Sequence, residues 1–167
     1  DVSFVGDYEV ERAFSLYYIA QKGIRVKVWG FNWGKLKFQH KNLIIYNYPL
    51  FKEDYRQAIS FSKISLCFLR KVNRDKITTR SIEIPACRGF MLAERTKAHE
   101  NLFQENIEAA YFSDNNELYE KIKYFLNNDK ERLKISKSGY KKCMETCDTQ
   151  SSTINRIIKF CENEFVI

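Results

Sequence analysis

The sequence predicts an α/β fold, a Rossmann-like, doubly wound parallel sheet of about six strands with a helical C-terminal tail. Three observations predict it. Short apolar runs typical of buried strands alternate with segments of helical spacing along most of the chain. Glycine or proline stands at several transitions between these segments. The 167 residues, 44% of them hydrophobic, can bury one substantial core, and no stretch rich in glycine, serine or proline divides them.

The beginning of the chain carries the pattern of a strand, a helix and a second strand. Residues 2–6 are an apolar run that ends at Gly6. Residues 8–22 place apolar side chains at helical spacing and stop at Gly23. Residues 24–30 alternate between apolar and polar side chains, as a strand does. This order predicts parallel strands joined by a crossover helix.

The same alternation continues along the chain. Residues 43–48 form an expected third strand, and Pro49 separates it from an expected helix over residues 51–61. The near-continuous apolar run over residues 64–69 is typical of a strand buried on both faces of a parallel sheet. The remaining elements follow in order: a basic loop, a helix over residues 80–87, strands over 90–93 and 109–112, a helix over 115–126, and a helical region beyond residue 129.

This pattern predicts one domain over residues 1–147 and a C-terminal helix over residues 148–167, which packs on that domain or on a further one. The chain begins at Asp1, immediately before the first strand pattern and without a methionine. We therefore expect another segment to precede it. Because no run approaches the roughly 20 apolar residues that span a bilayer, we expect no transmembrane segment.

The charge balance favours an anionic partner. Lysine and arginine number 28 against 21 aspartates and glutamates, a net charge of +7. Such a balance suits a phosphate-bearing ligand, nucleic acid or a membrane surface. The most concentrated basic segment is the loop after the fourth expected strand, with Arg70, Lys71, Arg74, Lys76 and Arg80.

The cysteines favour free thiols. There are five, without the spacing of a disulfide framework or a Cys-x-x-Cys pair. Since the two histidines, His40 and His99, lie far from the closely spaced Cys143 and Cys147, we expect no metal site. Free thiols suit a reducing, cytoplasmic location.

Two loops at the carboxyl ends of the expected strands are candidate ligand sites, because open parallel sheets bind ligands there. In the first loop, Gly6 lets a ligand approach the backbone, and the following helix N-terminus favours negative charge. In the second, Thr78 or Thr79 is an expected N-cap among basic residues. Neither a dinucleotide fingerprint nor a phosphate-binding Gly-x-x-x-x-Gly-Lys motif is present.

Glu83 lies one turn inside the helix that follows the second loop. A carboxylate there can accept two hydrogen bonds from a vicinal diol such as a ribose. The alternative interpretation is that Glu83 only complements the helix dipole and that the basic side chains are solvated. His99 also stands at a predicted helix start, where capping and ligand contact are both open. The aromatic residues Trp29, Trp33, Tyr46 and Tyr48 fit core packing better than ligand stacking.

The segment over residues 73–96, from Asn73-Arg74-Asp75 through Thr79-Arg80-Ser81-Ile82-Glu83 to Leu92-Ala93-Glu94-Arg95-Thr96, resembles the group 1 glycosyltransferases. More narrowly, it resembles their CgeB-like, spore-protein-type bacterial branch. Residues 1–6 and 28–33 are similar to the first two strands of that family. The resemblance extends over roughly residues 1–140 and is specific in the middle of the chain.

The resemblance implies a GT-B glycosyltransferase, in which two Rossmann-like domains face each other across a cleft. This chain would be the C-terminal, nucleotide-sugar-binding half, with the N-terminal domain missing. The acid-x7-acid motif of the family corresponds to Asp75 and Glu83. In relatives the second acid holds the ribose of the nucleotide and the first contacts the donor sugar. Here the first acid is Asp75, one methylene shorter than the usual glutamate.

The resemblance also implies how the donor diphosphate would be held. Backbone N–H groups at Thr78 and Thr79 would face the phosphates, and Arg12 would reach the diphosphate from the first loop. Arg74 and Arg80 would stabilise the charge of the leaving diphosphate without a bound metal. Asp75 and Arg80 are thus the expected catalytic residues. The expected donor-binding residues are Gly6, Arg12, Arg74, Thr78, Thr79 and Glu83.

The predicted function is transfer of a sugar from a nucleoside diphosphate sugar of the UDP or GDP type to an acceptor that is a glycan, a protein or a lipid. With the N-terminal half missing, we expect the domain to bind the donor without turning it over. The alternative is a non-catalytic basic α/β module that binds a polyanion, nucleic acid or a protein partner.

Overall fold

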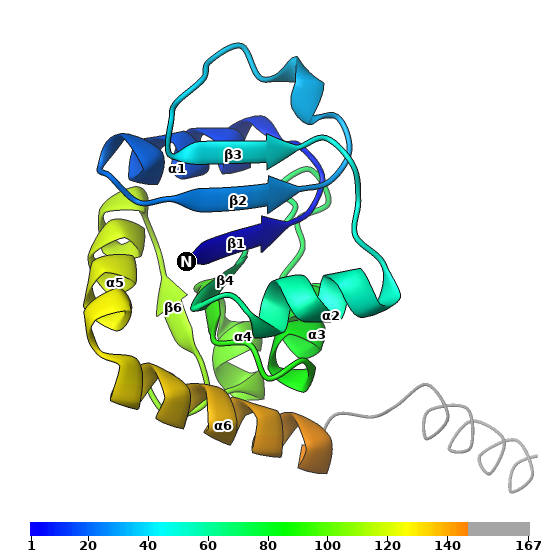
Figure 1. Cartoon of the computed structure of the whole chain (residues 1–167). Helices are drawn as coiled ribbons and strands as arrows, with labels where there is room; N and C mark the ends of the chain where they lie inside the picture. Colours follow the sequence, from blue (N-terminus) through cyan, green and yellow to red (C-terminus); the bar gives the residue numbers. More distant parts are fainter. Residues whose placement is uncertain (147–167) are drawn as a thin grey trace, which may run out of the picture.

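The computed structural model describes residues 1–146 (Figure 1). Its six strands are β1 (Val2–Val5), β2 (Val26–Trp29), β3 (Leu43–Tyr46), β4 (Ile64–Cys67), β5 (Met91–Glu94) and β6 (Ala110–Phe112). Its helices are α1 (Val10–Gln21), α2 (Lys52–Ser60), α3 (Arg80–Ala86), α4 (Lys97–Leu102), α5 (Asn115–Asn127) and α6 (Asp129–Thr146), with a 3₁₀ turn η1 (Trp33–Lys35).

The strands form one parallel sheet in the order β3-β2-β1-β4-β5-β6. The chain starts at the centre of the sheet, winds outward to β3, and returns to build the other half from β4. The strand order therefore reverses between β1 and β4, as it does in doubly wound folds. The predicted α/β fold with a parallel sheet is confirmed.

Helices cover both faces of the sheet (Figure 1). On one face α1 and α5 pack over alternate strand residues such as Phe4, Val28 and Leu66. On the other face α2, α3 and α6 pack over the intervening residues, such as Cys67 and Met91. The period of two along each strand thus supplies two separate cores. The central strands β1 and β4 are therefore buried along their whole length.

The 3₁₀ turn η1 was not predicted, and α4 was expected only as a helix start near His99. The connection from β2 to β3 contains η1 and an extended segment instead of a crossover helix. The six-residue helix α4 is also short, and its N-cap Thr96 accepts a hydrogen bond from the His99 N–H. Both are too short to show a hydrophobic period. The helical region beyond residue 129 is confirmed up to Thr146. The expected helix over 148–167 lies outside the described residues.

The carboxyl ends of β1 and β2 meet at a contact that only glycine permits. Gly30 has a φ of +152°, and a Cβ there would lie 2.1 Å from the Gly6 carbonyl oxygen. That oxygen accepts a hydrogen bond of 2.8 Å from the Trp33 indole. Trp33 is 2% exposed, which fits the core packing expected of it. The backbone around Gly6 is therefore held closely.

Within the described residues, no helix is long and apolar enough to cross a membrane.

Candidate functional site

A cleft of about 350 Å³ opens at the carboxyl ends of β1 and β2, beside the point where the strand order reverses. Four of the predicted site residues line it: Gly6, Thr79, Arg80 and Glu83. The rest of the lining comes from the end of β1, the loops after β1 and β2, the connection from β3 to α2, and α2 itself, with Asp7, Phe31, Phe51, Lys52 and Tyr55 among them. Residues that are 77 positions apart in sequence thus share one concave site, where open α/β sheets bind ligands.

Arg80 is one of two cationic residues that line this cleft, with Lys52. It is the first residue of α3, and its Nε donates a hydrogen bond to the Val5 carbonyl at the end of β1. Its two Nη groups have no hydrogen-bond partner among residues 1–146. The guanidinium is therefore anchored at one side and retains donors for an anion.

Glu83 faces the same cleft from α3 and is paired with Tyr55 of α2. The Tyr55 hydroxyl donates to Glu83 Oε2 over 3.0 Å. Burial, together with the adjacent Glu83 carboxylate, raises the pKa of Tyr55. The phenol is therefore a stable proton donor, and it fixes one oxygen of Glu83 while the other has no partner among the described residues.

The remaining predicted residues of the second loop lie next to the cleft without lining it. Arg74 is exposed with a φ of +55°, and Asp75 is half-buried. Thr78 donates its N–H to Ser81 Oγ over 3.1 Å. Thr79 is the residue before α3, as predicted, but its side chain makes no capping hydrogen bond.

Arg12 occupies a different environment from the one the sequence suggests for it. It is only 7% exposed and lies over the ring of Phe4, 5.7 Å from the centroid. Its Nη1 donates to the Asp7 carbonyl over 3.1 Å, and its Nε lies 3.7 Å from Glu9 Oε2. Burial lowers the pKa of this guanidinium. In this structure Arg12 stabilises the first loop through its contacts with Asp7 and Glu9.

The basic second loop is partly neutralised by carboxylates. Arg70 Nε lies 2.8 Å from Glu9 Oε1, and Lys71 Nζ lies 3.0 Å from Glu94 Oε1. Neither pairing could be read from local sequence, since the partners come from the first loop and from β5. The free positive charge of this loop is therefore smaller than its sequence suggests.

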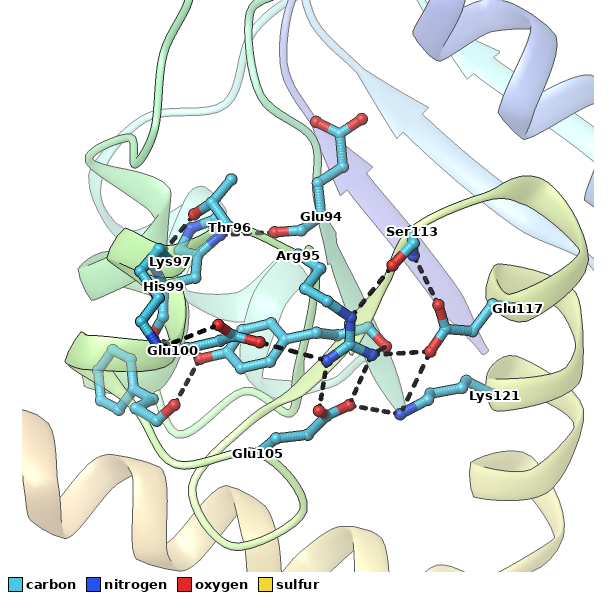
Figure 2. Close-up of polar contacts among 12 residues, drawn as sticks. Glu94, Arg95, Thr96, Lys97, His99, Glu100, Glu105, Ser113, Glu117 and Lys121 are labelled. Carbon is cyan, nitrogen blue, oxygen red and sulfur yellow. Dashed lines mark hydrogen bonds and ion pairs between the residues drawn. The ribbon is translucent and has the colours of Figure 1, made fainter.

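Beyond the cleft, the ends of β5 and β6 carry a dense polar network (Figure 2). Arg95 pairs with Glu105 and with Glu117, at 2.8 Å for the second pair. Lys121 lies 2.7 Å from Glu105, so one carboxylate links two cations. These bonds join the strand ends to α5. The pKa of Glu105 is lowered to about 2, first by its hydrogen bond from Arg95.

His99 belongs to the same corner and is fully buried. Its Nδ1 lies 2.7 Å from the Glu94 carbonyl oxygen, and its Nε2 lies 2.7 Å from Ser81 Oγ. The helix cap considered for His99 is instead supplied by the Thr96 hydroxyl. Within residues 1–146, no group of three or more His, Cys, Asp and Glu side chains is placed to hold a metal ion.

Sequence reasoning missed Tyr55, Lys52 and Phe31 as residues of the cleft. Tyr55 lies in a polar helical segment, and nothing local marks its contact with Glu83, 28 residues away. Phe31 is 52% exposed and follows Gly30 directly. The position of an aromatic residue directly after a glycine at the end of a strand was the one feature of the sequence that could have indicated Phe31 as a cleft residue.

Residues 12–159 match the model of the glycosyl transferase-like family. The chain belongs to this family. No protein of curated function matches it in sequence.

Solved structures share the fold of this glycosyl transferase-like chain. The C-terminal domain of a glycosyl transferase group 1 family protein from Francisella tularensis has a TM-score of 0.70 at 14% identity, with 89% of this chain and 86% of that chain covered. A glycosyltransferase from Rickettsia africae has a TM-score of 0.73 at 13% identity, with 99% and 48% covered. HepE from Anabaena, in complex with UDP-glucose, has a TM-score of 0.74 at 11% identity, with 98% and 48% covered.

The glycosyl transferase-like chain thus spans about half the length of the Rickettsia and Anabaena proteins. Its fold is that of the C-terminal domain of a GT-B glycosyltransferase, as the resemblance implied. At these identities the likeness establishes the fold, and the chemistry has to be argued from the site itself.

Proposed function

We propose that this chain is the donor-binding domain of a glycosyltransferase that transfers a sugar from a UDP- or GDP-type nucleoside diphosphate sugar to a glycan, protein or lipid acceptor. The observation that carries the proposal is the shared cleft of Arg80 and Glu83. It places a cation with free donors and a carboxylate with a free oxygen a helical turn apart on α3. The cation can bind a diphosphate, and the carboxylate can accept hydrogen bonds from the ribose diol next to it.

In this proposal Glu83 accepts the ribose hydroxyl groups, and Tyr55 keeps its carboxylate in one orientation. Arg80 binds the diphosphate and stabilises the negative charge that develops on it as the glycosidic bond breaks. Its bond to Val5 holds the guanidinium in place before the reaction, so little reorganisation is needed. Gly6 and Thr79 line the cleft beside the phosphates. Because the Gly6 N–H donates to the Trp29 carbonyl over 2.8 Å, Gly6 provides space for the phosphates and not a donor.

Further roles complete the proposal. Asp75 contacts the donor sugar, and Arg74 and Thr78 approach the phosphates from the second loop. Arg12 reaches the diphosphate only by leaving its site over Phe4; otherwise it acts by supporting the first loop. The acceptor and the catalytic base belong to an N-terminal domain, so this domain alone binds the donor without turnover. We place the protein in the bacterial cytoplasm and in the CgeB-like branch.

The test is an amide NMR titration of the chain with UDP, GDP and ADP. We expect saturable shifts for one nucleotide, centred on Thr79 to Glu83, and their loss in Glu83→Ala. Loss of a hydrogen-bonded charged group costs about 1.5–3 kcal/mol, or at least tenfold in affinity. Glu120→Ala, an exposed glutamate of α5, is the matched control and should bind as the wild type does. Shifts that survive in Glu83→Ala would contradict the proposed role.

A second candidate function, binding of a polyanion, is favoured by one observation. Residues 12–52 contain eight lysines and arginines and no aspartate or glutamate. All except Arg12 are exposed, and none of these exposed cations pairs with a carboxylate of residues 1–146. They are Lys22, Arg25, Lys27, Lys35, Lys37, Lys41 and Lys52. Of these seven residues Lys52 also lines the cleft with Glu83, and the other six do not, so variants of the other six test this function independently of donor binding.

A further inference from the structure

A chain of hydrogen bonds connects the second loop to α4 through two buried side chains, Ser81 and His99. Ser81 Oγ lies 3.1 Å from the Thr78 nitrogen and 2.7 Å from His99 Nε2. His99 Nδ1 lies 2.7 Å from the Glu94 carbonyl oxygen. Ser81 and His99 are both 0% exposed, so water does not compete for these bonds.

The partners determine where each proton lies. A carbonyl oxygen only accepts, so His99 Nδ1 carries the ring proton and donates to Glu94. Burial lowers the pKa of His99, which leaves Nε2 unprotonated and able to accept from the Ser81 hydroxyl. The Ser81 oxygen in turn accepts from the Thr78 N–H. Each of these three hydrogen bonds therefore has one defined donor and one defined acceptor.

These bonds fix the turn that leads into α3. The Thr78 carbonyl accepts from the Ser81 N–H, and the Thr79 carbonyl accepts from the N–H groups of Ile82 and Glu83. The orientation of this turn determines where Arg80 and Glu83 enter the cleft. No other buried side chain of residues 1–146 donates to or accepts from the backbone of Thr78 and Thr79.

The corner between β5 and α4 also holds the second loop at two further places. Glu94 Oε2 accepts from the Leu69 N–H over 2.7 Å, at the start of the loop. The Thr96 hydroxyl donates to the Lys76 carbonyl over 2.7 Å, near its end. The loop after β4 is therefore supported along its length by residues that do not line the cleft. A loop that is ordered in advance binds its ligand with a smaller loss of conformational entropy.

We propose that Ser81 and His99 are positioning residues of the donor site, which hold the first turn of α3 so that Arg80 and Glu83 face the cleft. The inference rests on the proposed donor-binding function. Neither residue touches the ligand; Ser81 acts through the Thr78 backbone, and His99 acts through Ser81.

The test compares two buried serines in the full chain. Ser81→Ala removes the hydroxyl without adding atoms. Ser3→Ala, the matched control, removes a hydroxyl that is 3.3 Å from Ser65 Oγ within the sheet. The first measurement is amide hydrogen exchange of Ile82 and Glu83 without ligand. The second is calorimetric affinity for UDP-glucose. For Ser81→Ala we expect faster exchange and about fivefold to tenfold weaker binding, the effect of one buried hydrogen bond.

Two variants of His99 give an independent test. His99→Gln keeps an acceptor within reach of Ser81. His99→Phe keeps a flat ring against Tyr111, whose ring centroid lies 5.8 Å away, but cannot accept a hydrogen bond. We expect UDP-glucose affinity to fall further in His99→Phe than in His99→Gln. A purely structural role would predict the opposite order, because phenylalanine preserves the packing better.

The outcomes separate the inference from the proposed function. Exchange at Ile82 and Glu83 that is equal in wild type, Ser81→Ala and Ser3→Ala overturns the inference whether or not a nucleotide binds. A wild-type chain that does not bind UDP-glucose counts against this donor, and hydrogen exchange then decides the inference alone. Equal affinity of Ser81→Ala and wild type, with UDP-glucose bound by both, also overturns it.

Discussion

At the scale of single residues, buried and half-buried polar side chains with defined partners organise the region around the cleft. Tyr55 orients Glu83, Ser81 holds the Thr78 backbone, and His99 holds Ser81. Each of these hydroxyl or ring groups would be costly to bury without its partner. The protonation state of His99 therefore contributes to the stability of the fold.

His99 predicts a loss of stability on acidification. Because burial lowers its pKa below the usual 6.5, the unfolded chain binds a proton more readily than the folded one does. The stability that neutral His99 contributes is complete above pH 6.5 and is lost as pH falls below that value. The slope cannot exceed about 1.4 kcal/mol per pH unit.

Urea denaturation measures the free energy of unfolding of wild type and His99→Phe at pH 7.5 and at pH 5.5. These pH values lie about one unit to either side of the usual histidine pKa. The charged neighbour of the ring is Glu94, and Tyr111 and Cys67 are the other titratable groups of this corner. All three, like His40, are retained in the variant. A steeper loss of stability in wild type than in His99→Phe is expected; parallel curves would exclude this role of His99.

At the scale of elements, the helices are positioned by close contacts with the strand connections. α6 packs on α3 and passes over the loop before β6. Gly139 of α6 makes the closest approach, since a Cβ there would lie 2.2 Å from the Glu108 carbonyl oxygen. This contact sets how near α6 comes to the sheet, and through α3 it bears on the cleft.

Gly139→Ala is therefore expected to destabilise the protein, against the usual helix preference. In an exposed helix the change from glycine to alanine stabilises by about 1 kcal/mol. Here the added methyl meets a backbone oxygen, which cannot move as a flexible side chain can, and we expect a net loss of about 1–3 kcal/mol. Urea denaturation measures it, with the exposed Lys137→Ala in the same helix as the control. A stability gain in Gly139→Ala would show that α6 can shift without cost.

At the scale of the whole molecule, charge is distributed unevenly. Outside residues 12–52 the lysines and arginines, 20 in number, nearly balance the 21 acidic residues. The net charge of +7 therefore comes from one continuous part of the chain, which forms α1, β2, β3 and their connections. Residues 35–38 also alternate in exposure: Leu36 and Phe38 are half-buried, and Lys35 and Lys37 are exposed.

This distribution predicts how a polyanion would bind, if the second candidate function holds. Single-stranded homopolymer RNA should bind at about 50 mM salt and dissociate steeply as salt increases. Charge reversal of Lys35, Lys37 and Lys41 to Glu should abolish that binding and leave UDP titration unchanged. The same reversal of Lys130, Lys134 and Lys137 on α6 is the matched control. Absence of RNA binding at low salt would remove this candidate.

The order and type of most elements followed from the sequence, because hydrophobic period and glycine stops are local properties. The strand near residues 64–69 was recognised from its apolar run alone, and it is β4. Four predicted site residues meet in one cleft, since the carboxyl ends of parallel strands share one edge of the sheet. The resemblance of residues 73–96 to group 1 glycosyltransferases agrees with the family that the chain belongs to.

The sequence by itself determined the fold class, the family and the edge of the sheet where the candidate cleft lies. Only the tertiary structure decided which charges are free: Arg12 is buried with Glu9, Arg70 and Lys71 are paired, and Arg80 keeps free donors. The physical reason is that strand and helix patterns depend on near neighbours along the chain. Charge pairing and burial depend on residues that only the folded chain brings together, as it does with Ser81 and His99.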